Sequence, residues 1–132
     1  MKQTSAFLVA VLCLLTFNSN AQITGTVYRD YNGNGTRQTV SPNNETGVKG
    51  VTITAYNTSN QVVNTTTSGS DGSYTLAYTV PVRLEFQIPT GTGCVNTTYD
   101  FNSFQGDGNS VRFVTSSPST QNYAINNPSD YV

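Results

Sequence analysis

The feature that most constrains this chain is a strict alternation of apolar and polar residues in short runs. It is clearest at residues 51–56 (VTITAY) and 82–88 (VRLEFQI). Because successive side chains of a strand point to opposite faces, each run places one apolar and one polar face across a sheet. The sequence shows no window with the spacing of an amphipathic helix. The chain is therefore predicted to be all-β.

Further runs rich in β-branched and aromatic residues predict strands at residues 23–29, 62–67, 73–80, 111–115 and 121–125. Between the strands lie turn signals in which Gly or Asn tolerates positive φ: Asn32-Gly33, Asn34-Gly35, Ser59-Asn60, Asp71-Gly72, Gly91 to Gly93 and Gly106 to Gly108. A total of about seven short strands separated by polar turns is typical of a β-sandwich.

The N-terminal segment has the three zones of a secretory signal. Lys2 supplies the positive charge, residues 6–17 form the apolar core, and a short polar stretch follows. The small residues Ser19 and Ala21 stand where signal cleavage requires them, which predicts a signal peptide over residues 1–21 and a mature start at Gln22. The predicted destination is secretion or the cell surface.

A membrane anchor is the alternative for this segment, but its apolar run has only twelve residues, whereas a spanning helix needs about twenty. A lipid anchor at Cys13 is disfavoured because the preceding Leu12 is large. Removing 21 of the 132 residues leaves 111, the size of one domain. We expect a sandwich over residues 22–125 and a linker or truncated C-terminal segment over residues 126–132, which lacks alternation and contains Pro128.

Charge and cysteine content limit the partners. The predicted mature chain has five basic and seven acidic residues, and the basic ones are dispersed, so nucleic-acid binding is disfavoured. Cys94 is its single cysteine, so no internal disulfide can form in it. Either Cys94 is a small buried residue or its partner lies in a longer natural protein.

One constellation has the residue types of a cation site. Asp30, Asn32 and Asn34 place side-chain oxygens at alternate positions before Gly35, as in loops that wrap calcium. An EF-hand is excluded because its twelfth position would be Ser41 instead of Glu and no helix flanks the loop. Another loop architecture could use Glu45 and Asp71 as remote carboxylates.

The competing interpretation is that these residues only form turns. Asp and Asn side chains commonly accept hydrogen bonds from nearby backbone N–H groups, and Asp71-Gly72 suits a hairpin turn. Three carboxylates that converge would repel one another without a cation and become its ligands with one. Whether Asp30, Glu45 and Asp71 converge is therefore the question that the structure must answer.

Three motifs in order resemble the B-type domain of serine-aspartate repeat surface proteins (SdrD B-like). They are residues 25–35 (GTVYRDYNGNG), 45–53 (ETGVKGVTI) and 70–76 (SDGSYTL), within a similarity that covers residues 23–88. That family belongs with the prealbumin-like, collagen-adhesin B-type (Cna-B-like) sandwiches. Residues 104–106, 111–114 and 128–131 are similar to the first such module of large secreted proteins from Bacteroidetes-type bacteria.

The resemblance implies a single immunoglobulin-like or prealbumin-like sandwich, acting as a non-catalytic structural or adhesive module of a secreted or cell-surface protein. It implies that calcium is bound, with Asp30, Asn32, Asn34, Glu45 and Asp71 as its ligands. It also implies neighbouring domains, an extracellular protein or a glycan as partners. Three departures are Gln38, where the family usually has an acidic residue, Gly69, where it often has Asp, and residues 41–44, which look inserted.

Some relatives carry a Lys–Asn isopeptide bond that starts from a lysine on the first strand. Arg29 occupies that strand here, and the single mature lysine, Lys49, precedes the second predicted strand, so no such crosslink is expected.

Catalysis is not expected, because the chain has no His and lacks a visible nucleophile with its base. Asp100 and Asp107 lie among Asn and Gly, as solvated turn residues do. The alternative function is a carbohydrate-binding sandwich that uses tyrosines as platforms. The tyrosines considered are Tyr28, Tyr56, Tyr74, Tyr78, Tyr99 and Tyr123.

Overall fold

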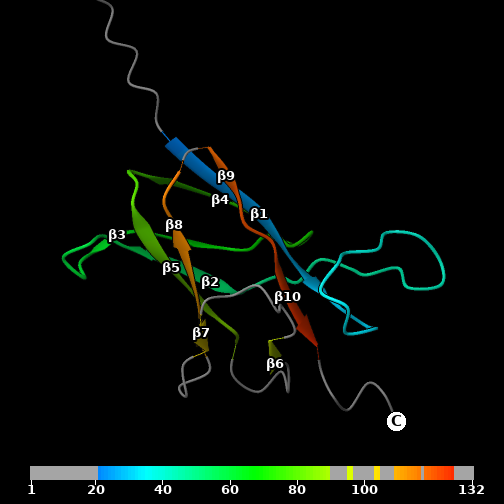
Figure 1. Cartoon of the computed structure of the whole chain (residues 1–132). Helices are drawn as coiled ribbons and strands as arrows, with labels where there is room; N and C mark the ends of the chain where they lie inside the picture. The colour runs from blue at the N-terminus through cyan, green and yellow to red at the C-terminus, as the bar shows by residue number, and fades with distance from the viewer. Residues whose placement is uncertain (1–20, 90–94, 97–102, 105–108, 117, 127–132) are drawn as a thin grey trace, which may run out of the picture.

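The computed structural model describes residues 21–89, 95–96, 103–104, 109–116 and 118–126, and within these ranges it contains strands and no helix (Figure 1). The strands are β1 (Ala21–Arg29), β2 (Thr52–Tyr56), β3 (Val62–Thr67), β4 (Ser73–Tyr78), β5 (Val82–Gln87), β6 (Val95–Asn96), β7 (Ser103–Phe104), β8 (Asn109–Val114), β9 (Ser119–Thr120) and β10 (Tyr123–Asn126). They form two sheets that pack as a sandwich, which confirms the predicted fold class.

The first sheet has the order β4-β1-β10-β6, and β9 also pairs with β1. β4 runs antiparallel to β1 along residues 21–26, whereas β9 and β10 run parallel to it. Beyond β4, residues 46–48 lie along β1: Arg29 N–H donates to the Thr46 carbonyl at 2.9 Å, and Val48 N–H donates to the Val27 carbonyl at 2.9 Å. The last residues of β1 are therefore bonded on both sides.

The second sheet has the order β3-β2-β5-β8-β7, and the neighbouring strands run antiparallel to one another. Its register pairs Ala55 with Leu84 and Ile53 with Phe86, so these apolar side chains share the face that meets the first sheet. The alternation that predicted β2 and β5 is the cause of this inward face.

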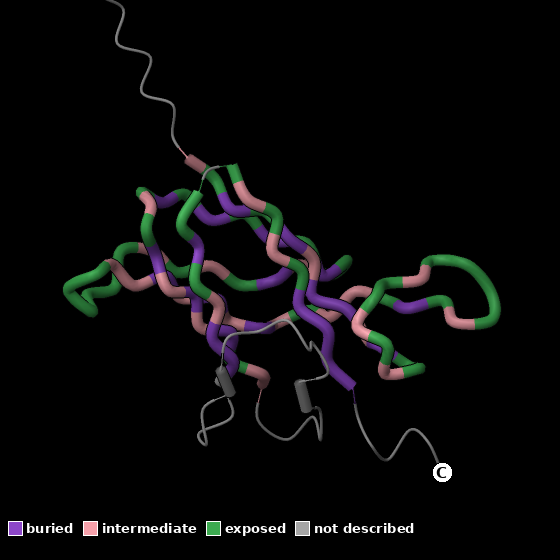
Figure 2. The backbone as a smooth tube through the Cα atoms, in the orientation of Figure 1, coloured by how far each residue is buried: buried purple, intermediate pink, exposed green. Residues whose placement is uncertain are grey.

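The core lies between the sheets and is built from alternate residues of the strands, as the alternation of buried and exposed segments shows (Figure 2). Phe86 is at its centre, with its ring 4.7 Å from that of Tyr123 and 5.9 Å from that of Tyr74. Burying each large apolar side chain contributes roughly 1.5–3 kcal/mol. This core therefore supplies the main stabilisation of the sandwich.

The path of the chain follows from the parallel pairing of β1 with β10. β1 starts at Ala21, and β10 ends beside the far end of β1, where Ile125 is the register partner of Arg29. Nine extended residues separate the two ends of β1 by roughly 26 Å. The described chain thus enters at one end of the sandwich and leaves at the other (Figure 1).

The predicted strands agree with the structure to within a few residues. The clearest differences are that β4 ends at Tyr78 and not at Val80, and that β6, β7 and β9 were not predicted. Positive φ is found at Asn60, Gly33, Gly35 and Gly72, as the turn signals indicate.

Several sequence predictions lie outside the described residues: most of the signal peptide, Cys94, Tyr99, Asp100, Asp107, both later glycine turns (residues 91–93 and 106–108), and all but the first residue of the 126–132 segment. Within the described part of the chain, no helix has the length and apolarity to cross a membrane.

Candidate functional site

The candidate site begins where β1 ends. Asp30 is the first residue of the β1–β2 connection and is fully buried. Its N–H donates to the Ile125 carbonyl of β10 at 2.9 Å. Its two carboxylate oxygens accept N–H groups of the loop that follows, from Asn34 at 3.1 Å and from Gly35 at 2.8 Å. Asp30 therefore ties the loop to the end of the sandwich where β10 leaves.

The loop itself is a series of side-chain turns. Asn32 Oδ1 accepts Asn34 N–H at 3.1 Å, and Asn34 Oδ1 accepts Thr36 N–H at 2.8 Å. Gly33 and Gly35 have φ of 70° and 72°, which side chains with a Cβ rarely adopt. The oxygens at alternate positions are thus directed into the loop, as both the turn interpretation and the calcium interpretation require.

Glu45 is the second buried carboxylate, with an exposed fraction of 1%. Its Oε2 accepts Gln38 N–H at 2.7 Å, and its own N–H donates to the Gln38 carbonyl at 2.7 Å. Its Oε1 has no hydrogen-bond partner in the described part of the chain. A buried carboxylate oxygen without a partner costs free energy, so this atom marks a place where a ligand is expected.

Asp71, the third candidate carboxylate, is held within its own turn. It is exposed, and its Oδ1 accepts both the N–H (3.0 Å) and the hydroxyl (2.6 Å) of Ser73. These bonds, foremost that from the hydroxyl, lower the pKa of its carboxyl, and Arg37 lowers it further. The Asp71 backbone packs against Gly47, where a Cβ would stand 1.7 Å from the Asp71 carbonyl oxygen. The turn thus approaches the loop through its backbone.

The structure brings Asp30, Asn32 and Asn34 together in one loop and attaches Glu45 to it through Gln38. It shows no group of three or more His, Cys, Asp or Glu residues arranged to hold a metal ion, within the residues it describes. Convergence of Asp30, Glu45 and Asp71 is therefore not seen, and their role as ligands stays a prediction.

Sequence reasoning missed how buried Glu45 is and how closely Gln38 and Arg37 are bound to it. Arg37 Nε donates to the Glu45 carbonyl at 3.3 Å. Asn32 Nδ2 also donates to Gln38 Oε1 at 2.7 Å. Gln38 therefore connects Asn32, through its side chain, with Glu45, through its backbone. No local sequence signal reveals these contacts, because they depend on the return of the chain after residue 41.

The tyrosines considered as sugar platforms are mostly core residues. Tyr28, Tyr74, Tyr78 and Tyr123 are buried. Tyr56 is half-buried, and the Arg83 guanidinium lies 4.5 Å from its ring centre. Burial, with Glu85 nearby, raises the pKa of Tyr56. No flat exposed tyrosine platform is formed by these residues.

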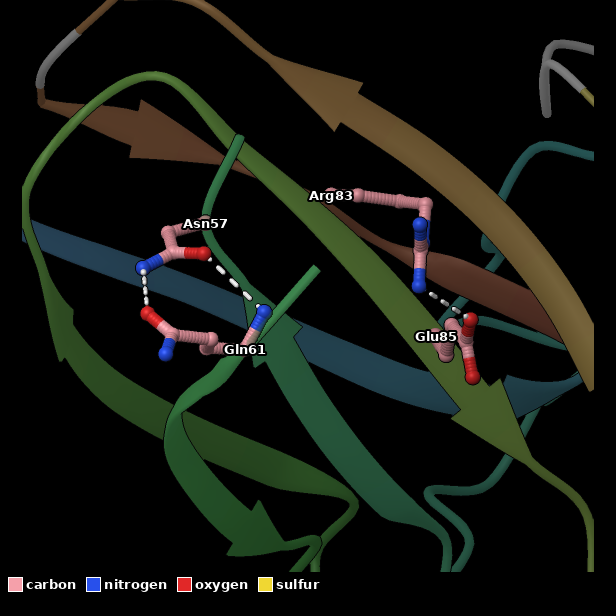
Figure 3. A network of polar contacts seen from close by, with 4 residues as sticks. All are labelled: Asn57, Gln61, Arg83 and Glu85. Atoms are coloured by element: carbon pink, nitrogen blue, oxygen red, sulfur yellow. Dashed lines mark hydrogen bonds and ion pairs between the residues drawn. The ribbon is translucent and has the colours of Figure 1, made fainter. Parts of the chain in front are cut away.

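Figure 3 shows polar contacts on β5 and at the turn after β2. Arg83 pairs with Glu85 at 3.0 Å. At the turn after β2, Asn57 Oδ1 accepts Gln61 N–H at 3.0 Å, and Asn57 Nδ2 donates to Gln61 Oε1 at 3.2 Å. The ion pair lies along β5, and the Asn57–Gln61 contacts close the turn between β2 and β3, so both have a structural role.

Comparison with known proteins defines the class. The model of the SdrD B-like domain family matches residues 21–130, which is most of the chain. The chain therefore belongs to the SdrD B-like domain family, as the three motifs indicated. Membership places it among structural modules of surface proteins and not among enzyme families.

One similar solved structure is the shaft pilin SpaA from Lactobacillus rhamnosus GG, with 14% sequence identity and a TM-score of 0.48. The similarity covers 81% of this chain and 50% of the pilin chain, so this chain spans about half the length of that protein. No curated protein matches the sequence.

Proposed function

We propose that this chain is a non-catalytic spacer module of a secreted or cell-surface protein, and that calcium bound at the β1–β2 loop stiffens its exit end. Its immediate partners would be neighbouring domains of a longer surface protein. The observation that carries the proposal is the buried, unpartnered Oε1 of Glu45 beside the loop that Asp30 organises.

The chemistry of these residues suits a hard divalent cation. Calcium prefers carboxylate and carbonyl oxygens, and the loop offers carboxylates from Asp30 and Glu45 and amide oxygens from Asn32 and Asn34. A cation would be the partner that Glu45 Oε1 lacks among the described residues. Asp71 is included as a remote ligand only by the family resemblance, since Ser73 now holds its carboxylate.

The position of the loop suits a spacer. The Asp30 N–H donates a hydrogen bond to the carbonyl of Ile125, one residue before β10 ends. An ion bound here would restrict the loop and β10 together, at the point where the chain leaves the sandwich. Because entry and exit lie at opposite ends, modules joined in this way would follow one another lengthwise. A structural role is thus favoured over an adhesive one.

The alternative of a tyrosine-based carbohydrate module receives no support from the five candidate tyrosines that the structure describes, because four are buried and Tyr56 is covered by Arg83.

The test is thermal unfolding with calcium and with chelator. Calcium that binds only the folded state must raise the midpoint. With about 10 mM calcium and a Kd on the order of 0.1 mM, the gain is about 2.7 kcal/mol, or roughly 10 °C for a domain of this size. Asp30→Asn should abolish the rise, whereas Lys49→Gln, a control at an exposed position outside the site, should keep it.

Asp71→Asn separates the two versions of the site. If Asp71 is a ligand, this variant loses most of the calcium-dependent rise. If it only closes its turn with Ser73, the rise persists and Asp71 leaves the ligand set. An unchanged midpoint in the unsubstituted protein would refute calcium binding altogether.

A further inference from the structure

A polar pocket of about 260 Å³ lies where the β1–β2 loop passes the segment that joins β9 to β10. Arg37 and Thr36 line it from the loop, Thr120 and Asn122 from the β9–β10 segment, and Arg112 from β8. No acidic residue lines it among the described residues. This pocket is separate from the oxygen ligands proposed for calcium.

Two guanidinium groups from different elements face this pocket. Arg112 is the register partner of Leu84, whose side chain is fully buried, so Arg112 lies on the inward face of its sheet at the margin near β10. Arg37 is anchored through its Nε to the Glu45 carbonyl, and its terminal nitrogens make no hydrogen bond to the described residues. Guanidinium groups of this kind recognise carboxylates through paired hydrogen bonds.

The remaining groups of the pocket supply hydrogen-bond donors and acceptors. Asn122 Oδ1 accepts Thr26 N–H at 3.0 Å, which fixes the orientation of the amide. Thr36 and Thr120 add hydroxyls, which both donate and accept. Tyr28 fixes the rim, because its hydroxyl donates to the Gly35 carbonyl at 2.8 Å. The pocket is therefore preformed on its β1 side.

The size and chemistry select a ligand class. A volume of 260 Å³ is more than a carboxylate alone requires. Hydroxyls and an amide beside two cations suit a polyhydroxylated ring that bears one carboxylate. An extended peptide is disfavoured, since the Gln121 backbone is already bonded to Thr24 and to the Tyr74 hydroxyl.

We propose that this pocket binds a uronic acid unit of an acidic polysaccharide. Its carboxylate lies between Arg37 and Arg112, and its hydroxyls contact Thr36, Thr120 and Asn122. The proposal goes beyond the calcium-stiffened spacer and gives the module a point of contact with an acidic glycan. A single sugar unit should bind weakly, with a Kd on the order of 1–10 mM.

The experiment is an NMR titration of the protein with glucuronate, in chelator, so that its result does not depend on calcium. Saturable shifts of the Thr36, Arg37, Thr120 and Asn122 amides are expected. Glucose, which lacks the carboxylate, should bind at least about tenfold more weakly, because it forgoes the charge-assisted bonds. Equal binding of acetate and glucuronate would overturn the assignment to a sugar.

Variants test the residues. Arg37→Gln and Arg112→Gln should each weaken glucuronate binding about tenfold, and Lys49→Gln, which changes the net charge equally, should leave it unchanged. Thr36→Val keeps both charges and should weaken binding a few fold, which guards against loss of folding in the arginine variants. Absence of saturable shifts, or equal losses in Lys49→Gln, would refute the proposal.

Discussion

The contact between Gly47 and the Asp71 turn offers the sharpest test of how the loop is attached to the sandwich. A Cβ on residue 47 would stand 1.7 Å from the Asp71 carbonyl oxygen and 2.1 Å from its carbonyl carbon. Both atoms are backbone, so no side-chain rotation can relieve the clash. The Gly47→Ala change must therefore push the turn and the loop apart.

The expected loss in the free energy of unfolding follows from the hydrogen bonds beside this clash. Separation strains the hydrogen bond from Val27 N–H to the Gly72 carbonyl (2.8 Å) and that from Val48 N–H to the Val27 carbonyl (2.9 Å). Two such bonds are worth about 1 kcal/mol each, and the lost packing adds about 1–3 kcal/mol. We expect Gly47→Ala to lower the free energy of unfolding by roughly 3–5 kcal/mol.

Urea unfolding measures this difference, and Gly33→Ala is the matched control. Gly33 has open space around its Cβ position but a φ of 70°, so alanine there introduces backbone strain of about 1–2 kcal/mol without a clash. The reasoning requires a clearly larger loss at Gly47 than at Gly33. A loss at Gly47 equal to or below that at Gly33 would refute the close packing of loop and turn.

Three further predictions concern buried groups. Glu45→Gln should leave stability in chelator unchanged or raise it by about 1 kcal/mol, because a buried carboxylate oxygen without a hydrogen-bond partner among the described residues is removed, and should abolish any stabilisation by calcium; thermal unfolding in both conditions checks this. Tyr123→Phe should lower the free energy of unfolding by about 1 kcal/mol in urea, since it leaves the buried Ser110 hydroxyl without its 2.9 Å bond. Burial raises the pKa of Tyr123 from 10.0 to about 12, so the stability it contributes is complete below pH 10 and lost as the pH rises through 12; alkaline unfolding followed by tyrosinate absorbance should show this loss, and Tyr123→Phe should reduce it.

Sequence reasoning identified the strands well because the cause is local. Alternation in residues 51–56 and 82–88 specifies an inward face wherever these strands pair, and the Gly33 turn needs only its own backbone conformation. The pairing itself could not be predicted this way. That β10 lies parallel to β1 depends on contacts between segments about a hundred residues apart.

The candidate site was predicted in part for the same reason. Asp30, Asn32 and Asn34 act within one short loop, so their spacing was informative. Glu45 and Asp71 reach the loop by tertiary packing, which buries Glu45 and leaves Asp71 exposed on its own turn with Ser73. Spacing suggested only those three residues, and the family resemblance added Glu45 and Asp71; neither could distinguish these two environments.

Calcium binding at the β1–β2 loop is tested most directly by a calorimetric titration of calcium into the chelator-treated protein. We expect one bound calcium per chain, with a Kd on the order of 0.1–1 mM as for other extracellular modules. We also expect the binding heat to disappear in Asp30→Asn and in Glu45→Gln. A protein that shows no saturable heat, or whose binding survives both substitutions, would contradict the assignment of calcium to this loop.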